Sequence, residues 1–285
     1  MRFDTHLHVW WPDDGAGIRI RARLPELDRD FSLETVLPAL AAAGVEKAIL
    51  VSAAQEEADT ERLLDVAAAH PQLVRGVIGW LDLEAGAVAD RIAHYRADPN
   101  WLGARLPLTI IEDRRFIARP AVIAALRRLA ETGGIAEILA APDQLDSVAE
   151  TLGGVAGLRV VVDHAGNPDF AVPPTPEWRA GVARLATLPG AVCKVSSFWA
   201  PGDPPLDAAR ALPFFAHIVD CFGPARMIAA ANWPVSTLLG PYDESWRLLD
   251  RLAPLCGLSA ADAARILFGT AHAFFSPRLP RTTEV

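Results

Sequence analysis

The chain has 285 residues, a hydrophobic fraction of 51% and a charged fraction of 22%. It is long enough for one large barrel or two ordinary domains, and this composition indicates a fold with a sizeable buried core. The formal net charge of -8 argues against a nucleic-acid partner, because it leaves no basic footprint. No apolar run is long enough to span a bilayer and no signal peptide opens the chain, so we expect no membrane partner and a cytoplasmic location.

Short apolar or β-branched runs recur along the whole chain, with segments of helical character between them. Runs such as 74–78 and 158–162 are almost entirely apolar, which is typical of parallel strands covered on both faces. The predicted strands are residues 3–10, 47–53, 74–83, 101–106, 135–141, 158–165, 191–198 and 227–235. Alternating strands and helices in this number predict an α/β fold, a (β/α)8 TIM barrel, as a single domain over 1–276 with a C-terminal tail over 277–285. The alternative is an open doubly wound sheet, but no Gly-x-Gly-x-x-Gly follows an early strand.

Helix signals lie between these strands. Residues 60–70 carry an apolar face, and residues 120–132 begin with a proline and end at two glycines. Residues 33–43 contain Pro38, which predicts a kink or a late start. The proline-rich stretches 172–176 and 201–205 are predicted to be loops after the sixth and seventh strands.

Two histidines, His6 and His8, alternate on the first predicted strand. Residues two apart on a strand point to the same side, so both imidazoles face one space, as metal ligands or acid–base groups do. A structural role at a strand end is the alternative. His164 follows the sixth strand, and three histidines in one barrel mouth would form a ligand set. Asp163 beside it either orients an imidazole or caps the following turn.

Other polar and aromatic residues fall at the same strand ends. Lys194 lies on an apolar strand and either neutralises a substrate carboxylate or pairs with Glu137. The guanidinium of Arg105 suits a carboxylate or a lactone carbonyl, or a salt bridge across the mouth. Ser196 lies on the seventh predicted strand. Trp10 and Trp233 either form walls of a substrate site or pack in the core.

Six segments carry a family resemblance, and they read DTHLHVW (4–10), GVIGWLDLE (76–84), GARL (103–106), VVDHAGNP (161–168), CKVSSF (193–198) and ANWPV (231–235). In order and spacing they resemble the amidohydrolase-2 family of the amidohydrolase superfamily. The nearer resemblance is to its branch of sugar-acid lactonases and 2-pyrone-4,6-dicarboxylate hydrolase. It covers the chain from residue 3 to about residue 275.

The resemblance implies a distorted barrel that hydrolyses a lactone or a related cyclic ester, a small-molecule substrate. It implies His6, His8 and His164 as catalytic residues; in metal-dependent relatives they surround a divalent ion such as zinc, together with an aspartate of the eighth strand. Some members of the lactonase branch work without a metal. The carboxylated lysine of binuclear relatives would lie on the fourth strand, where this chain has Arg105, so we expect at most one metal ion. The resemblance does not decide the oligomeric state, and it allows a homo-oligomer.

The chain departs from the family pattern on the eighth strand. The pattern there reads Ser-Asp-Trp-Pro-Val, whereas this chain has Asn232 in place of the aspartate. The aspartate is the family's expected general base, and a carboxamide has no useful basicity. Loss of a positioned base costs on the order of 100-fold to 10,000-fold in rate.

Three hypotheses about function follow. The leading one is a lactone hydrolase in which a histidine replaces the missing base and in which Asn232, Arg105, Lys194, Ser196, Trp10 and Trp233 form the rest of the site. The second is a catalytically silent barrel that binds a sugar acid or lactone. The third is a decarboxylase or hydratase of an unsaturated dicarboxylate.

Overall fold

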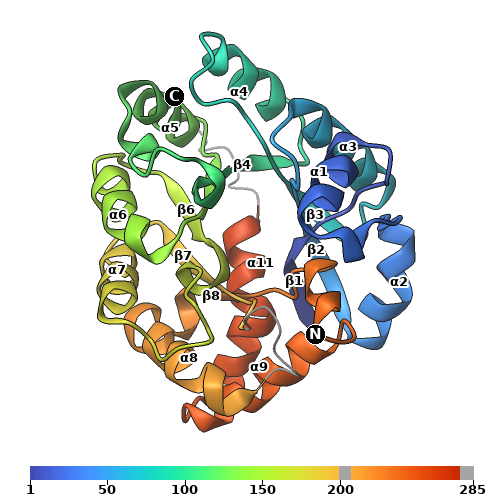
Figure 1. Cartoon of the computed structure of the whole chain (residues 1–285), viewed down its shortest axis with the longest axis vertical. Coiled ribbons are helices and arrows are strands. Elements are labelled where there is room, and N and C mark those ends of the chain that lie inside the picture. Colours follow the sequence, from blue (N-terminus) through green and yellow to red (C-terminus); the bar gives the residue numbers. More distant parts are fainter. Residues whose placement is uncertain (199–206, 277–285) are drawn as a thin grey trace, which may run out of the picture.

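The computed structural model describes residues 1–198 and 207–276. The predicted loop 201–205 and the predicted tail 277–285 lie outside these residues. Eight parallel strands are hydrogen-bonded in chain order from β1 to β8 (Figure 1). They are β1 (Arg2–Leu7), β2 (Val45–Val51), β3 (Val74–Gly79), β4 (Trp101–Pro107), β5 (Ile135–Leu139), β6 (Arg159–Val162), β7 (Ala191–Val195) and β8 (Met227–Ala229). The predicted (β/α)8 barrel is confirmed. Except for β4, each strand of the structure ends earlier than the range predicted for it. The predicted ranges were too long because apolar residues continue into the loops.

In Figure 1 the other labelled helices surround the strands, whereas α11 is seen in the centre of the view. The described residues contain eleven α-helices. They are α1 (Gly15–Arg23), α2 (Leu33–Ala42), α3 (Glu57–Ala69), α4 (Val88–Arg96), α5 (Pro120–Glu131), α6 (Leu145–Gly153), α7 (Pro176–Ala186), α8 (Ala208–Phe222), α9 (Glu244–Leu255), α10 (Ala260–Ala264) and α11 (Thr270–Phe275). The predictions for α3 and α5 are confirmed. The late start predicted for α2 is wrong, because the helix begins at Leu33 and includes Pro38. The loop predicted over 172–176 ends one residue early, since Pro176 takes the first position of α7.

The two edges of the sheet meet between β1 and the segment after β8. The backbone N–H of His8 donates to Trp233 O at 2.8 Å, and Thr5 Oγ1 donates to Ala229 O at 2.9 Å. At the amino-terminal end of the barrel, Ala271 and Phe275 of α11 pack in one apolar cluster with Phe3. A packed interior leaves the carboxyl ends of the strands as the place for a binding site.

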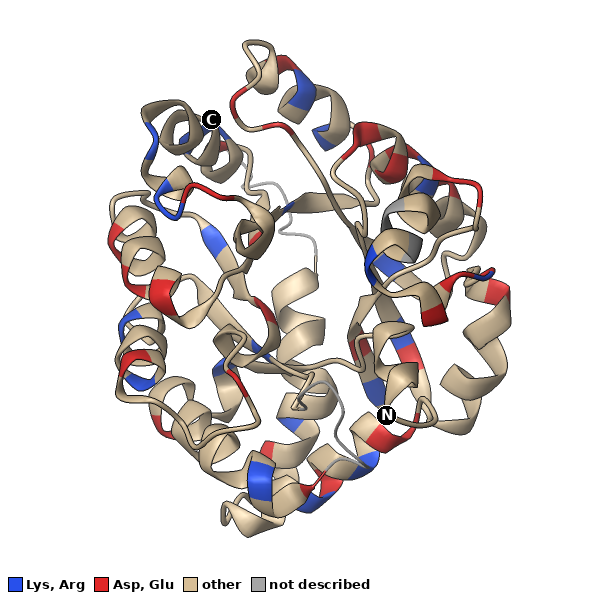
Figure 2. Ribbon diagram, viewed as in Figure 1, with Lys and Arg blue, Asp and Glu red and all other residues tan. Residues whose placement is uncertain are grey.

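Charged residues lie mostly on the outer helices and loops (Figure 2). The exceptions are a few fully buried charged groups at the strand ends, which are described below. None of the helices in the described part of the chain has the length and apolar character that a membrane span requires.

Candidate active site

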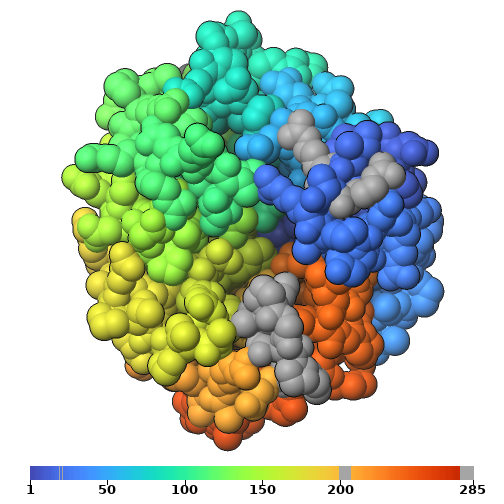
Figure 3. Space-filling view, viewed as in Figure 1, coloured from blue at the N-terminus to red at the C-terminus, as the bar shows by residue number. Residues whose placement is uncertain are grey.

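A cavity of about 410 Å³ opens at the carboxyl ends of the strands. Figure 3 shows a hollow in the centre of this face. Four of the residues predicted for the site, His8, Arg105, His164 and Asn232, line the cavity. The other five, His6, Trp10, Lys194, Ser196 and Trp233, are buried and are not part of its wall.

Strained backbone presents three of the polar side chains around this cavity. His164, Ser197 and Asn232 have positive φ angles of 47°, 58° and 58°, and they follow β6, β7 and β8. Left-handed backbone at a non-glycine residue costs about 1–3 kcal/mol, and it is enriched at functional sites. Asparagine tolerates this conformation better than most residues. The local strain is therefore concentrated where three strands deliver side chains to one space.

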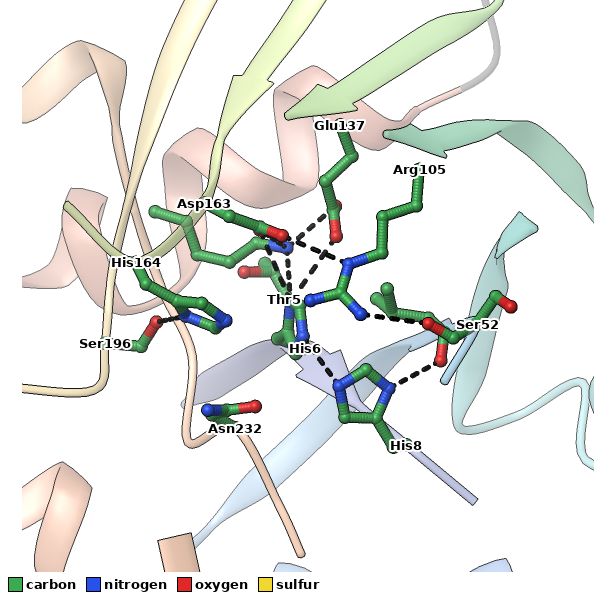
Figure 4. A network of polar contacts seen from close by, with 12 residues as sticks. Thr5, His6, His8, Ser52, Arg105, Glu137, Asp163, His164, Ser196 and Asn232 are labelled. Atoms are coloured by element: carbon green, nitrogen blue, oxygen red, sulfur yellow. Dashed lines mark hydrogen bonds and ion pairs between the residues drawn. The ribbon is translucent and has the colours of Figure 1, made fainter. Parts of the chain in front are cut away.

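The two histidines of β1 face the same side, as predicted. Nε2 of His6 lies 3.0 Å from Nε2 of His8, and Nδ1 of His8 lies 2.7 Å from Val51 O (Figure 4). A carbonyl oxygen only accepts, so Nδ1 of His8 donates to it and Nε2 of His8 keeps its lone pair. Burial holds the pKa of His8 well below its usual range, and nearby His6 adds to this effect. His8 is therefore neutral at pH 7.

A fully buried ion cluster lies beneath the cavity. Lys194 Nζ donates to Glu137 Oε2 at 2.7 Å and lies 3.0 Å from Asp163 Oδ1 and 2.9 Å from His6 Nδ1. The structure therefore contains the ion pair between Lys194 and Glu137 that was one of the two expected roles of this lysine. Burial and the charge of Asp163 raise the pKa of Glu137 to about 7. Burial also opposes the charge on Asp163, but the Lys194 ammonium together with His6 and His164 holds the pKa of Asp163 well below its usual range.

Arg105 crosses the mouth from β4. Its Nη1 donates to Ser52 O at 3.0 Å, and its Nε donates to Asp163 Oδ2 at 3.4 Å (Figure 4). Its side chain is 11% exposed, so it reaches the cavity. Because a guanidinium carries five N–H donors, these two contacts leave donors for a bound carbonyl or carboxylate.

His164 connects to β7 and to the segment after β8 through hydroxyl groups. Its Nδ1 lies 2.8 Å from Ser196 Oγ and 3.3 Å from Ser197 Oγ. Asn232 Nδ2 donates to Ser197 Oγ at 2.8 Å. Burial holds the pKa of His164 well below its usual range. A serine hydroxyl both donates and accepts, so these contacts are compatible with either tautomer of the neutral ring, which has a lone pair on one of its two nitrogens.

Three of the buried residues, His6, Asp163 and His164, bring ligand atoms within 4.8 Å of one another, which is close enough to share a metal ion. The set expected from the sequence contained His8 and not Asp163. The carboxylate of Asp163 was expected either to orient an imidazole or to cap the following turn. Asp163 Oδ1 lies 3.0 Å from Lys194 Nζ but makes no well-aligned hydrogen bond among the described residues, so it has a lone pair to offer. Imidazole nitrogens and a carboxylate suit zinc and related divalent ions, so these donors fit a metal.

The two tryptophans pack in the core. Trp10 is fully buried, and its ring lies 5.2 Å from that of Phe31. Trp233 is 5% exposed and packs on the same phenylalanine at 5.4 Å. Of the two expected roles, both tryptophans therefore have the packing role. The chain folds back after β1 and brings Phe31 between Trp10 and Trp233. Trp80, which was not among the predicted site residues, lines the cavity instead.

One buried polar residue beside the site was missed. Asp4 is fully buried and accepts the N–H groups of His6 at 3.0 Å and Ala231 at 3.1 Å, together with the hydroxyl of Tyr242 at 2.7 Å. It thereby joins β1 to the segment that carries Asn232. Burial raises the pKa of Asp4 to about 6. A carboxylate inside an apolar strand was the sequence signal, but two of its three partners, Ala231 and Tyr242, are more than 200 positions away.

Fold and site together define a barrel enzyme with neutral histidines, a buried carboxylate and an arginine at the carboxyl ends of its strands. The family model described as amidohydrolase matches residues 3–276, and the chain belongs to this amidohydrolase family.

Three relatives illustrate the similarity. The L-fucono-1,5-lactonase of Burkholderia ambifaria is 30% identical over 277 residues, which cover 96% of this chain and 95% of that protein. The L-fucono-1,5-lactonase of Burkholderia multivorans is 30% identical over 288 residues, with 95% of this chain and 94% of that protein covered. A crystal structure of an amidohydrolase from Burkholderia multivorans with bound zinc has a TM-score of 0.89 and 30% identity, and the match covers 96% of this chain and 99% of that chain.

Proposed function

We propose that this protein hydrolyses the lactone of a sugar acid, with the 1,5-lactone of an L-fuconic-acid-like sugar as the first candidate. The observation that carries the proposal is the mouth cavity, where an arginine, two neutral histidines and Asn232 line one space of about 410 Å³. A volume of this order suits a small ring-shaped ligand. The similarity to two L-fucono-1,5-lactonases over nearly the whole chain supports the substrate class.

Arg105 is suited to polarising the lactone carbonyl. Its guanidinium is held by Ser52 O and Asp163 Oδ2, so its orientation is fixed before a substrate binds. A preorganised donor stabilises the negative charge that develops on the carbonyl oxygen as water attacks. The buried setting strengthens this effect, because little water competes for the same donors.

His164 is the group best placed to take a proton from the attacking water. It lines the cavity, and its Nδ1 lies 2.8 Å from Ser196 Oγ. In the tautomer that donates from Nδ1 to this hydroxyl, the other ring nitrogen carries the lone pair. Asp163 next to it stabilises the imidazolium that forms when His164 accepts a proton. His164 thereby takes the role that an aspartate at position 232 has in the family pattern.

A divalent metal, with zinc as the first candidate, would be held by His6, Asp163 and His164 and would supply Lewis-acid polarisation of the carbonyl. In that state His164 is a ligand, so a base role for it belongs to the metal-free protein. Metal content and activity therefore have to be measured together.

The test is a titration of released acid on a panel of aldonic lactones. We expect L-fucono-1,5-lactone or a close relative to be hydrolysed, and His164→Gln to lower kcat about 100-fold or more. His94→Gln, which alters a histidine on α4 away from the cavity, is the matched control. No hydrolysis of any lactone by the wild-type protein would overturn the proposal.

A second candidate function is a barrel that binds a sugar acid without turnover. The presence of Asn232 on the cavity wall, where the family pattern has an aspartate, favours it. Calorimetric binding of a lactone or sugar acid in the absence of any hydrolysis would support this alternative.

A further inference from the structure

Lysine is almost absent from this chain. Among 27 lysines and arginines, only Lys47 and Lys194 are lysines. Lys47 lies on β2, where its Nζ reaches Gln72 O in an exposed position. Lys194 lies on β7 with a side chain that is fully buried. A chain that uses arginine almost everywhere else therefore has its one buried lysine at the centre of the candidate active site.

The surroundings of Lys194 suit an ammonium group. An ammonium has three N–H donors, and three acceptors lie within 3.0 Å of Nζ, namely Glu137 Oε2, Asp163 Oδ1 and His6 Nδ1. They come from β5, the end of β6 and β1. A planar guanidinium directs its donors as a rigid fork and is larger, so it does not reproduce this arrangement. The space around Nζ therefore suits a compact cation such as an ammonium better than a guanidinium.

Two of these three acceptors belong to the residues that would hold a metal. His6 and Asp163 form the candidate metal site together with His164. Lys194 donates a hydrogen bond to the lone pair of His6 Nδ1 and forms an ion pair with Asp163, so both groups are already engaged by a cation. It also places a fixed positive charge beside the space that a divalent ion would fill, and like charges at such distances repel strongly in a buried setting.

We propose that Lys194 is the internal cation of this site: its ammonium supplies the positive charge that a metal would supply to Asp163 and His6, and it lowers the affinity of these residues for divalent metals. This effect of Lys194 on metal affinity goes beyond the proposed function and does not depend on it, because zinc affinity is measured without any lactone.

The experiment measures zinc affinity by competition with a chromophoric chelator. We compare the wild-type protein, Lys194→Met, which keeps most of the unbranched side chain without its charge, and Lys47→Met, which removes the other lysine. We expect Lys194→Met to bind zinc at least tenfold more tightly than the wild type, and Lys47→Met to match the wild type. Adding His164→Ala to Lys194→Met is expected to abolish the gain, because the gain depends on the same ligand set.

Removing Lys194 alone leaves buried carboxylates without their cation, which can prevent folding. The double variant Lys194→Met/Glu137→Gln removes one charge of each sign and keeps the three candidate ligands. Tighter zinc binding by either folded variant supports the proposal, and unchanged or weaker binding by both overturns it. Stoichiometric zinc that stays with the wild-type protein during dialysis against a chelator overturns it without any variant.

Discussion

The carboxamide of Asn232 donates a hydrogen bond to the hydroxyl of Ser197 at 2.8 Å. Ser197 in turn lies 3.3 Å from Nδ1 of His164, so the residue that replaces the family's aspartate is connected to the proposed base by one hydroxyl group. Both Asn232 and His164 line the cavity. This relationship makes position 232 the most direct test of the mechanism.

We expect Asn232→Asp to raise the rate of lactone hydrolysis. A carboxylate at this position is itself a competent base and stabilises a protonated His164, so kcat should rise by roughly 100-fold if base strength limits the wild-type reaction. Steady-state kinetics on the best lactone substrate check this. The matched control is Asn167→Asp, because Asn167 also lines the cavity and also has a positive φ, of 50°. Equal gains in both variants would assign the effect to added charge and not to a base at position 232.

We expect Arg105→Met to lower kcat/KM for lactones about 100-fold to 1,000-fold, as loss of a donor to the developing oxyanion does. Arg105→Lys should recover only part of this loss, because an ammonium cannot reproduce the fork that contacts Ser52 O and Asp163. Arg114→Met, which breaks an exposed ion pair with Asp143, is the control and should leave the kinetics unchanged. Wild-type kcat/KM in Arg105→Met would contradict the assigned role.

Gly103 should not tolerate a side chain. A Cβ at this position would lie 2.0 Å from Ile135 O on the neighbouring strand β5. We expect Gly103→Ala to lower the free energy of unfolding by about 3 kcal/mol or more, or to prevent folding. Gly153→Ala, in the helix α6, is the control. A Cβ at this position would come no closer than 3.8 Å to the side chain of Leu188. Denaturant unfolding should show this control to be neutral, or stabilised by up to about 1 kcal/mol.

The two tyrosines of the chain should resist ionisation in the folded state. Burial and nearby Glu57 raise the pKa of Tyr95 from 10.0 to about 12, and burial with the adjacent Asp4 raises the pKa of Tyr242 well above 10.0. The folded state therefore holds both protons more tightly than the unfolded state. The resulting stability is present below pH 10.0 and is lost as the pH rises through the folded pKa of about 12 for Tyr95.

Phenolate absorbance in the near ultraviolet measures this titration. The native protein should show no phenolate at pH 10.0, whereas the denatured protein should be half ionised there. A native titration that follows the denatured curve would contradict the assigned burial of both side chains.

Much of the fold was predictable because parallel strands covered on both faces leave an apolar signal that needs no knowledge of their partners. All eight strands were found in this way. Their ends were not, since the apolar character of segments such as 80–83 continues after the last ladder hydrogen bond of β3. The helix α2 was also misjudged at its start, because Pro38 is accommodated within it.

The sequence by itself determined that His6 and His8 share one side of the chain, because the two-residue period of an extended backbone places them there. It also placed Arg105, His164 and Asn232 at strand ends that meet in one barrel mouth. Only the tertiary structure decided what Lys194 does. Its partner His6 is 188 positions away in the chain, and closure of the barrel brings them within 2.9 Å. The same closure buried Trp10 and Trp233 and made Asp163 a candidate ligand, since contacts between distant strands depend on packing that no local pattern encodes.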